Sequence, residues 1–359
     1  MSKFQQYLRP TIGGVALACA LVVLMVFTGS ETIQKVTKYE PIHASSKSEL
    51  NDSPPWLSLA QTEDGVEFDS DSEEKSYESA THTNEPNQQL QLSPQSRVVY
   101  NRVGKCGSRT VIAVLNKLST RNGFTLYSSN VYNRTHVSLK EQIDIVNTVS
   151  SLKPPYVYQR HFHYIDFPKF GAIQPVYINI IRDPINRFVS GYYYKRFGDA
   201  DNQKYMKKSF PSKNMTVDEC VLLNKEECSD KKLFYMIPFF CGQHPYCSTP
   251  SQLALDRALS NLDKRFLVVG FIEKIDETMQ VLEQLLPDIF GGAVEILLHP
   301  ETSAKTNDTS SKNKIPPSSH VRTILRDRMK YEYMFYEAAL SRFTYILRKL
   351  GIEKTKKRW

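Results

Sequence analysis

The pattern of apolar and polar residues divides the chain into three regions. An uncharged, mostly apolar run occupies residues 12–29, whereas acidic and small polar residues dominate 30–96. The first run has about the length that crosses a bilayer. The second region has too few large apolar side chains to offset the entropy of ordering. From residue 97 onward, apolar runs alternate with helical spacing, so 97–359 is the region predicted to fold.

Within the third region, near-continuous apolar runs predict three buried strands, at residues 98–100, 176–181 and 266–270. Each run leads through a polar turn into a helical pattern. The first helix is expected to have Ser108 as its N-cap and to stop at Gly123, and the last to run from about Ser319 to Leu350. This alternation indicates an α/β fold with helices on both faces of a mainly parallel sheet.

The apolar N-terminal run also predicts membrane topology. Lys3 and Arg9 precede it, so the positive-inside rule places the N-terminus in the cytoplasm and the rest of the chain in the secretory lumen. We interpret the segments as a cytoplasmic tail (1–11), a transmembrane signal-anchor (12–29), a disordered acidic luminal stem (30–96) and a luminal domain (97–359). A cleaved signal peptide, with small residues at Thr28, Gly29 and Ser30, is the alternative.

Charge is unevenly distributed along the chain. The formal net charge is +8, although residues 30–97 carry 13 acidic and 5 basic side chains. The part from Val98 onward is therefore strongly basic, and a basic domain on an acidic tether favours a polyanionic partner. Nucleic acid, acidic lipid and sulfated glycan satisfy this argument equally.

Cysteines and sequons agree with an oxidising lumen. Four cysteines cluster in one short stretch, at Cys220, Cys228, Cys241 and Cys247. Three pairings are open, and we favour nearest neighbours, Cys220–Cys228 with Cys241–Cys247. A zinc site that includes His244 is the alternative, although the spacings do not match common zinc fingers. Asn-x-Ser/Thr sequons predict glycosylation at Asn51, Asn133, Asn214 and Asn307, with Asn51 the weakest because Pro54 follows it.

A loop between the first strand and helix predicts an anion-binding site. The loop and helix start read Lys105, Cys106, Gly107, Ser108, Arg109 and Thr110. Backbone N–H groups at a helix N-terminus attract anionic oxygens, and Lys105 would neutralise charge on a transferred group. The segment is not a Walker A motif, because its lysine precedes the second glycine. An ordinary turn with a surface lysine is the alternative.

A second group of residues follows the strand at 176–181. Arg182 ends this strand and Ser190 lies about two helical turns further on, so both are expected at the carboxyl edge of the sheet, where open α/β sheets bind ligands. A guanidinium and a hydroxyl suit a terminal phosphate. Arg187 is interpreted instead as a partner of Asp183.

Together these residues resemble the PAPS-dependent sulfotransferases, and more closely the uronic acid 2-O-sulfotransferases. Four segments carry the likeness in order, NRVGKCGS (101–108), YINIIRDP (177–184), RFGD (196–199) and IPFFCG (237–242), within about 98–350. Cys106, Arg109 and the run Gly242-Gln243-His244-Pro245 are more similar to the uronyl 2-sulfotransferase and Pipe branch than to the heparan sulfate 2-O-sulfotransferases proper. The resemblance implies a P-loop-like sulfotransferase fold. It also implies transfer of a sulfuryl group from PAPS (3′-phosphoadenylyl sulfate) to the 2-hydroxyl of a hexuronic acid in a glycosaminoglycan.

The resemblance also implies roles for single residues. His161 would be the catalytic base that takes a proton from the sugar hydroxyl, and imidazole suits that task near neutral pH. Lys105 would assist catalysis by neutralising charge. The donor's phosphosulfate is expected on residues 105–110, and its 3′-phosphate on Arg182, Ser190, Ser310, Ser311 and Lys312. Acceptor contacts are expected from Arg102, Lys207 and Lys208. His163 is interpreted as a structural residue.

The same resemblance implies a Golgi-resident type II membrane enzyme that needs no metal. Its expected partners are an acidic polysaccharide and, through its own anchor, the Golgi membrane, but no nucleic acid. Relatives use residues beyond the point matching Trp359 to assemble oligomers, so a homo-oligomer stays open. Iduronate or glucuronate, and dermatan/chondroitin or heparan sulfate, are open acceptors. A catalytically inactive glycan-binding module with a sulfotransferase fold is the alternative, and a P-loop kinase or hydrolase ranks last.

Overall fold

The computed structural model describes residues 96–131, 134–198, 213–300, 302, 311 and 313–352. The expected tail and anchor, and the stem up to residue 95, lie outside these ranges. Among the helices that are described, none combines the length and the apolar character needed to span a bilayer.

One sheet of five parallel strands forms the centre of the described region, in the order β2-β3-β1-β4-β5. Its strands are β1 (Arg97–Asn101), β2 (Thr125–Ser128), β3 (Tyr156–Arg160), β4 (Val176–Ile181) and β5 (Phe266–Phe271). β1, β4 and β5 coincide with the predicted apolar runs, and the parallel α/β arrangement is confirmed. The sequence pattern misses β2, a mostly exposed edge strand, and β3, in which the polar Gln159 and Arg160 are buried.

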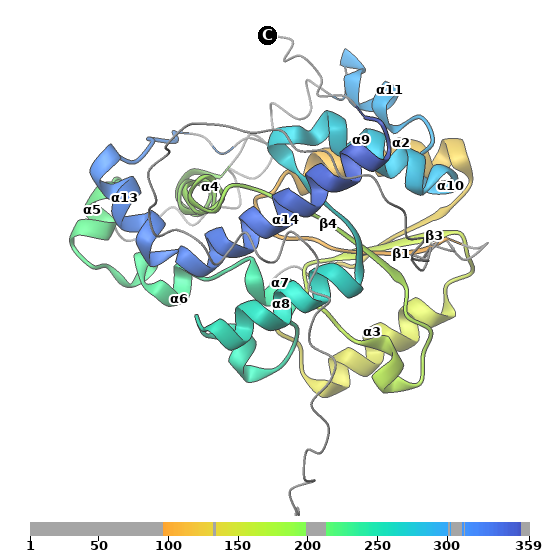
Figure 1. Cartoon of the computed structure of the whole chain (residues 1–359), viewed down its shortest axis with the longest axis horizontal. Coiled ribbons are helices and arrows are strands. Elements are labelled where there is room, and N and C mark those ends of the chain that lie inside the picture. The colour runs from red at the N-terminus through yellow and green to blue at the C-terminus, as the bar shows by residue number, and fades with distance from the viewer. Residues whose placement is uncertain are drawn as a thin grey trace, which may run out of the picture. The chain divides into compact units, whose positions relative to one another are not determined.

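Helices cover both faces of the sheet (Figure 1). One face carries α2 (Ser108–Asn122), α9 (Ile275–Leu285), α10 (Pro287–Phe290) and α11 (Ala293–Leu298), and the other carries α3 (Leu139–Ser151), α7 (Ile237–Cys241) and α8 (Gln252–Lys264). α14 (Lys330–Lys349) packs against the edge strand β5 and against α8. Buried side chains from the strands and from both helical layers form one continuous core.

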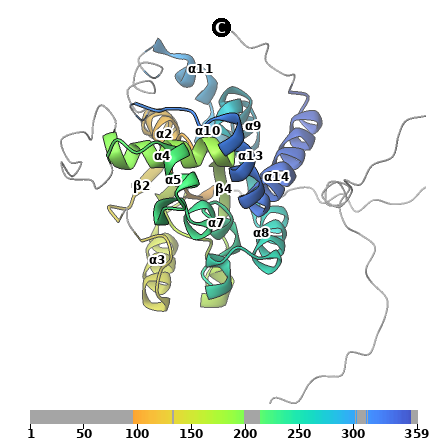
Figure 2. The same cartoon turned by 90° about the vertical axis from the view of Figure 1, so that its left-hand side faces the viewer.

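α4 (Pro184–Phe197) lies across the carboxyl ends of the strands (Figure 2). One side of it joins a second buried cluster with α5 (Val217–Leu222) and α13 (Ser319–Arg328), through Ile185, Phe188, Val189, Tyr192 and Tyr193. At 3.6 residues per turn, Arg187, Gly191 and Tyr194 lie on the opposite side of this helix. α4 therefore has one face for packing and another turned toward the β1–α2 loop.

The ends of two helices differ from the sequence prediction. α2 begins at Ser108 itself, and its N-cap is Gly107, with φ 76°. Gly123 ends α2 in a left-handed conformation, φ 72°, as predicted. The single helix expected from Ser319 to Leu350 is two helices, α13 and α14, that meet at Met329. Met329 is buried in the second cluster, and no glycine or proline marks the break.

Candidate active site

The β1–α2 loop has a backbone suited to binding an anion. Lys105 and Gly107 both adopt the left-handed conformation, with φ 67° and 76°. A side chain at Gly107 would also collide with Ile272, so two constraints select glycine at this position. The first N–H groups of α2 follow directly, at the positive end of the helix dipole. This is the local geometry with which helix N-termini hold phosphate and sulfate oxygens.

A buried pair of amides fixes the base of the loop. Asn179 Nδ2 donates to the carbonyl oxygen of Asn101 at 2.7 Å and to Asn101 Oδ1 at 3.0 Å. Asn101 Nδ2 donates in turn to the carbonyl oxygens of Phe162 and Phe239. Because buried amides need such partners, the pair ties β1, β4, α7 and the segment after β3 into one rigid base. The sequence contains both asparagines in its family-like segments but does not reveal that they pair.

His161 follows β3 and is bonded to the start of the same loop. The parallel register sets Asn101 beside Arg160, and the N–H of Arg102 donates to the carbonyl oxygen of Arg160 at 3.0 Å. His161 Nδ1 lies 2.8 Å from the carbonyl oxygen of Arg102. A carbonyl oxygen can only accept, so Nδ1 carries the proton and Nε2 keeps its lone pair.

The environment of His161 keeps its imidazole neutral. Burial lowers the pKa of His161 to about 4, and the nearby Arg102 guanidinium acts in the same direction. Arg102 itself is buried, with 5% of its surface exposed, and lies close to Tyr100 as well as to His161. Arg102, which the sequence predicts to contact the acceptor, therefore has a buried side chain close to the imidazole of His161.

Two cations of the loop region meet one aromatic ring of α4. Lys105 Nζ lies 3.7 Å from the centroid of the Tyr194 ring, and Arg109 Nη2 donates to the Tyr194 hydroxyl at 3.3 Å. Tyr194 follows Ser190 by one helical turn, so it lies on the same face of α4 as the predicted phosphate ligand, one turn nearer the end of the helix. Tyr194 was not predicted as a site residue, although its position four residues after Ser190 on a predicted helix could have indicated it.

Cys106 of the loop and Arg187 of α4 both have buried side chains. The Cys106 side chain is part of the main core, and burial raises the pKa of its thiol to about 12, with Arg187 acting in the opposite direction. The thiol therefore keeps its hydrogen, and its Sγ donates to the carbonyl oxygen of Gly104 within the loop at 3.7 Å. Arg187 stacks 4.1 Å from the centroid of the Tyr235 ring, whereas the Asp183 carboxylate caps α4 by accepting the N–H of Asn186 at 2.8 Å. The predicted pairing of Arg187 with Asp183 is replaced by these two separate roles.

Ser190 and Arg182 converge on one segment near the start of α13. The Ser311 hydroxyl donates to the carbonyl oxygen of Ser190 at 3.0 Å, and the two Oγ atoms lie 3.3 Å apart. Three residues further on, burial and the nearby Arg182 guanidinium lower the pKa of the Lys314 ammonium. Two hydroxyls thus meet at Ser190 and Ser311, and two cations lie near each other at Arg182 and Lys314, groups that suit a multiply charged anion. Lys314 was not among the residues predicted from the sequence.

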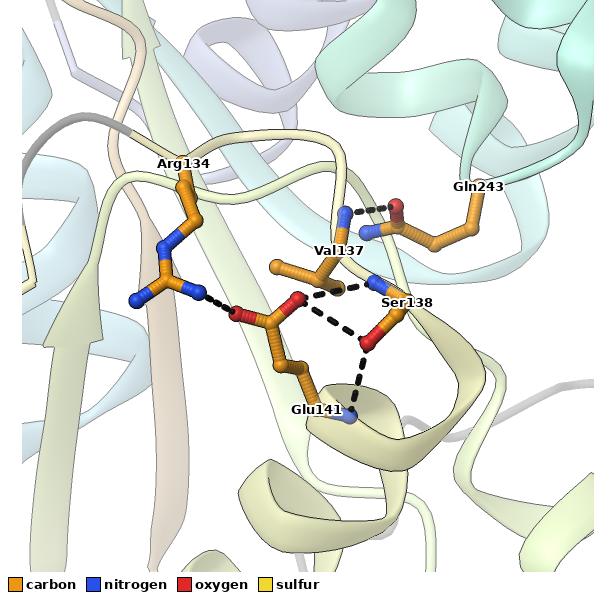
Figure 3. A network of polar contacts seen from close by, with 5 residues as sticks. All are labelled: Arg134, Val137, Ser138, Glu141 and Gln243. Carbon is orange, nitrogen blue, oxygen red and sulfur yellow. Dashed lines mark hydrogen bonds and ion pairs between the residues drawn. The ribbon is translucent and has the colours of Figure 1, made fainter. Parts of the chain in front are cut away.

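Gln243 holds the segment that follows His161. Its Nε2 donates to the carbonyl oxygen of His163 at 2.7 Å, and its Oε1 accepts the N–H of Val137 at 2.9 Å (Figure 3). Its own carbonyl oxygen lies 2.9 Å from His136 Nε2. The ring of His163 is buried edge-on against Phe239, which agrees with its interpretation as a structural residue.

The loop before α3 is fixed at its other end by a capping box. Ser138 Oγ accepts the N–H of Glu141 at 3.3 Å, and Glu141 Oε2 accepts the N–H of Ser138 at 3.0 Å. The other carboxylate oxygen forms a 2.7 Å ion pair with Arg134 (Figure 3). Hydrogen bonds therefore hold residues 134–138 in place beside the segment that carries His161.

A buried carboxylate accepts hydrogen bonds from the backbone at the start of α7. Glu332 of α14 is fully buried and accepts the N–H groups of Tyr235, Met236 and Ile237 at 3.0–3.1 Å. Burial raises the pKa of Glu332, while these donors and Arg187 act in the opposite direction. The same turn presents the Tyr235 ring on which Arg187 stacks.

The remaining predicted residues have different outcomes. The structure pairs Cys220 with Cys228 and Cys241 with Cys247, as predicted. Asn214 lies in a turn and is exposed, as a glycan acceptor must be. Seven predicted residues fall outside the described ranges: Lys207, Lys208, Ser310, Lys312, Asn51, Asn133 and Asn307. Within the described part of the chain, no group of histidine, cysteine or carboxylate side chains is arranged to hold a metal ion.

The fold and this site define an α/β protein that places an anion-binding loop beside a neutral imidazole. Residues 88–354 match the sulfotransferase family, and the chain belongs to that family. It is 43% identical over 263 residues to the uronyl 2-sulfotransferase of Homo sapiens, which covers 72% of this chain and 65% of that one. The matched part is thus just under two thirds of that relative's length.

Two other relatives carry a different acceptor in their names. The heparin sulfate O-sulfotransferase of Drosophila melanogaster is 38% identical over 261 residues, covering 70% of this chain and 73% of that one. The heparan sulfate 2-O-sulfotransferase 1 of Gallus gallus is 35% identical over 270 residues, covering 73% and 75%. The likeness to the uronic acid 2-O-sulfotransferases is thereby confirmed.

Proposed function

We propose that this chain transfers a sulfuryl group from PAPS to the 2-hydroxyl of a hexuronic acid in a glycosaminoglycan. The observation that carries the proposal is the bond of His161 Nδ1 to the carbonyl oxygen of Arg102 at the start of the anion-binding loop. It gives a neutral imidazole with a free Nε2 lone pair beside a site for an anionic group. The names of the relatives supply the 2-position and the uronic acid.

The residues present fit a nucleotide with charge at both ends. The N–H groups at the start of α2, with Lys105 and Arg109, would hold the phosphosulfate end. Arg182, Ser190, Ser311 and Lys314 would hold the 3′-phosphate. The donor supplies an activated sulfuryl group, and the protein supplies position and charge neutralisation.

Proton transfer falls to His161. Its Nε2 accepts the proton of the attacking sugar hydroxyl, while the Nδ1 bond to Arg102 keeps the ring in the required tautomer. A pKa of about 4 in the chain alone makes the imidazole a weak base. The negative charges of donor and acceptor would raise this pKa when they bind, because opposite charge favours the protonated ring. Lys105 would neutralise the negative charge that gathers on the leaving oxygen.

An acidic polysaccharide is the proposed acceptor. Arg102 is placed beside His161, and Lys207 and Lys208 are proposed to extend the contact along the polymer. The proposal covers acceptors of the dermatan/chondroitin and heparan sulfate types, because relatives of both names match.

We further propose a single-pass type II protein of the Golgi membrane, anchored by residues 12–29 with the sulfotransferase domain in the lumen. Two disulfides and an exposed Asn214 sequon support a luminal domain. A shift in gel mobility after removal of N-glycans, abolished by Asn214→Gln in a background without the other sequons, would test this topology. An unglycosylated chain that is accessible from the cytosol would contradict it.

Labelled sulfate transfer tests the activity. The full chain is incubated with labelled PAPS and with desulfated chondroitin, dermatan or heparan acceptors, and the product disaccharides are analysed. We expect label at the 2-position of the uronic acid, and none with His161→Ala. Label confined to another position would overturn the acceptor assignment. Salt-sensitive glycan binding without turnover or nucleotide binding would favour the inactive glycan-binding module.

A further inference from the structure

The Lys105 ammonium is held by an aromatic ring that the transfer chemistry does not itself require. Its Nζ lies 3.7 Å from the centroid of the Tyr194 ring, which is close range for a cation over a π face. The Lys105 stem runs along α4, where its Cγ would be in ordinary contact, 3.8 Å, with a β-carbon at Gly191. Gly191 and Tyr194 lie three residues apart, so they present one continuous surface to the lysine.

The second cation, Arg109, is held by the other end of the same side chain. Arg109 Nη2 donates to the Tyr194 hydroxyl at 3.3 Å, and its guanidinium carbon lies 6.0 Å from the ring centroid. One tyrosine therefore orders one cation with its π face and another with its oxygen. Lys105 and Arg109 flank Gly107, the N-cap of α2, on the two sides of the anion-binding turn.

We infer that Tyr194 is a positioning residue for the sulfuryl end of the donor site, an inference that rests on the proposed function. A free lysine side chain loses much rotamer freedom when it binds an anion, and a ring that already orders it removes part of that cost. An ammonium has three N–H donors, and a ring that contacts one side of it does not by itself prevent a hydrogen bond from another side to an oxygen. Contact with Tyr194 and contact with an anion are therefore compatible.

The position of Tyr194 makes its effect local to one end of the nucleotide. Ser190, one turn earlier on α4, bonds Ser311 and belongs to the proposed 3′-phosphate side. Tyr194 contacts only the cations of the β1–α2 region among the charged residues named in the site. Loss of Tyr194 should weaken ligands that carry a 5′-phosphate and leave ligands with a 3′-phosphate alone unaffected.

Isothermal titration with two nucleotides separates these ends. The probes are adenosine 3′,5′-bisphosphate and adenosine 3′-monophosphate, titrated into the wild type, Tyr194→Leu and Tyr194→Phe. For Tyr194→Leu we expect a loss of about 3- to 30-fold in affinity for the bisphosphate, the range that a cation–π contact spans. Affinity for the monophosphate should change less than about twofold. Tyr194→Phe keeps the ring and should recover most of the bisphosphate affinity.

A Lys105→Ala background assigns the effect to its physical source. The difference between Tyr194→Leu and Tyr194→Phe measures the ring, and it should disappear when Lys105 is absent. In steady-state assays Tyr194→Leu should lower kcat as well as raise the KM for PAPS, whereas Lys105→Ala with Tyr194→Leu should be no slower than Lys105→Ala with Tyr194→Phe. If Tyr194→Leu does not fold, Tyr194→Met supplies a flexible apolar side chain that also lacks a π face.

A remote lysine–tyrosine contact provides the matched control. On α14, Lys349 Nζ lies 5.4 Å from the ring centroid of the exposed Tyr345, so Tyr345→Leu removes a similar contact and should leave both affinities unchanged. Equal losses for both nucleotides in Tyr194→Leu would overturn the inference, as would unchanged or tighter binding of the bisphosphate. If the wild type binds neither nucleotide, the proposed function fails and this inference fails with it.

Discussion

The imidazole of His161 donates its Nδ1 hydrogen to the carbonyl oxygen of Arg102, with 2.8 Å between the two heavy atoms. The bond joins the end of β3 to the start of the loop after β1, at the point where these neighbouring parallel strands leave the sheet. It sets the orientation of the ring and its tautomer together. The imidazole proposed as the base is thereby held in fixed relation to the proposed anion-binding loop, by a bond to a backbone carbonyl oxygen of that loop.

Removal of the imidazole should slow turnover strongly and leave donor binding intact. For His161→Ala we expect kcat to fall by about 10²- to 10⁴-fold, the usual contribution of a positioned general base. The affinity for adenosine 3′,5′-bisphosphate should stay within about twofold of the wild type, because the proposed nucleotide contacts come from the β1–α2 loop and from Ser311 and Lys314. Transfer assays and calorimetry measure the two quantities. His320→Ala, at an exposed position on α13, is the control, and a His161→Ala enzyme with wild-type kcat would exclude His161 as the base.

The partly buried His161 and the buried His163 should make the folded state sensitive to acid. Burial lowers the pKa of His161 to about 4 and that of His163 to about 3, from an ordinary value of 6.5. Below pH 6.5 the unfolded chain therefore binds protons that the folded chain does not, so the free energy of unfolding falls as the pH falls. The full contribution is present above pH 6.5 and is lost on approach to the folded-state pKa values.

His163→Leu isolates one of these titrations. Leucine keeps the buried apolar contact with Phe239 and cannot bind a proton. Urea unfolding at several pH values between about 7 and 4.5 should show a flatter dependence for this variant than for the wild type. His320→Leu should retain the wild-type slope, since His320 is exposed. Identical slopes for His163→Leu and the wild type would show that His163 is not held neutral.

The sequence predicted those parts of the fold in which neighbouring residues alone, such as an apolar run or a glycine, indicate the structure. β1, β4 and β5 are continuous apolar runs, and Gly123 ends α2 where the pattern places it. β3 escaped because Gln159 and Arg160 are polar yet buried, and only the neighbouring strands explain that burial. The break at Met329 escaped because tertiary packing in the second cluster, not a local signal, determines it.

The candidate site shows the same division. Lys105, Gly107 and Ser190 follow from motifs that one segment carries. In the structure Ser190 lies on α4 and bonds Ser311, and Lys105 of the β1–α2 loop contacts Tyr194 of the same helix. The Asn101–Asn179 pair joins residues 78 positions apart, and Gln243 bridges chain segments that no spacing rule connects. Such contacts depend on topology, so they become visible only when the strands are assembled.

Glu332 should be a major contributor to stability although it lies away from the chemistry. Its buried carboxylate accepts three backbone N–H groups at the start of α7, of which those of Met236 and Ile237 are buried as well. Glu332→Gln replaces one acceptor oxygen by an NH₂ group facing these donors, and we expect a loss of about 1–3 kcal/mol in the free energy of unfolding. Glu332→Ala should cost more, because it leaves every donor without a partner. Chemical denaturation measures both.

The same helix offers a control for Glu332. Glu337 lies on α14 and pairs with Arg326 at 3.0 Å, with the two side chains 58% and 62% exposed. Glu337→Gln removes a carboxylate of the same type from a solvated ion pair, so stability should change by less than about 1 kcal/mol. Equal effects of Glu332→Gln and Glu337→Gln would contradict a structural role for the buried carboxylate.

The two disulfides should have the same effect on stability and different effects on activity. Each closes a short loop, with sequence separations of 8 for Cys220–Cys228 and 6 for Cys241–Cys247. Loop-closure entropy gives about 2–3 kcal/mol for either.

The loop closed by Cys241–Cys247 also contains Gln243, which the other disulfide loop does not. Gln243 bonds His163 and Val137 next to the segment that carries His161. Replacing Cys241 and Cys247 by serine should therefore let Gln243 and its bonded segments move. We expect kcat to fall about 10-fold or more, because a small misplacement of catalytic groups has an effect of this size. Replacing Cys220 and Cys228 should lower the unfolding free energy alone, and unaltered kcat in both double variants would show that the Gln243 loop does not act on the site.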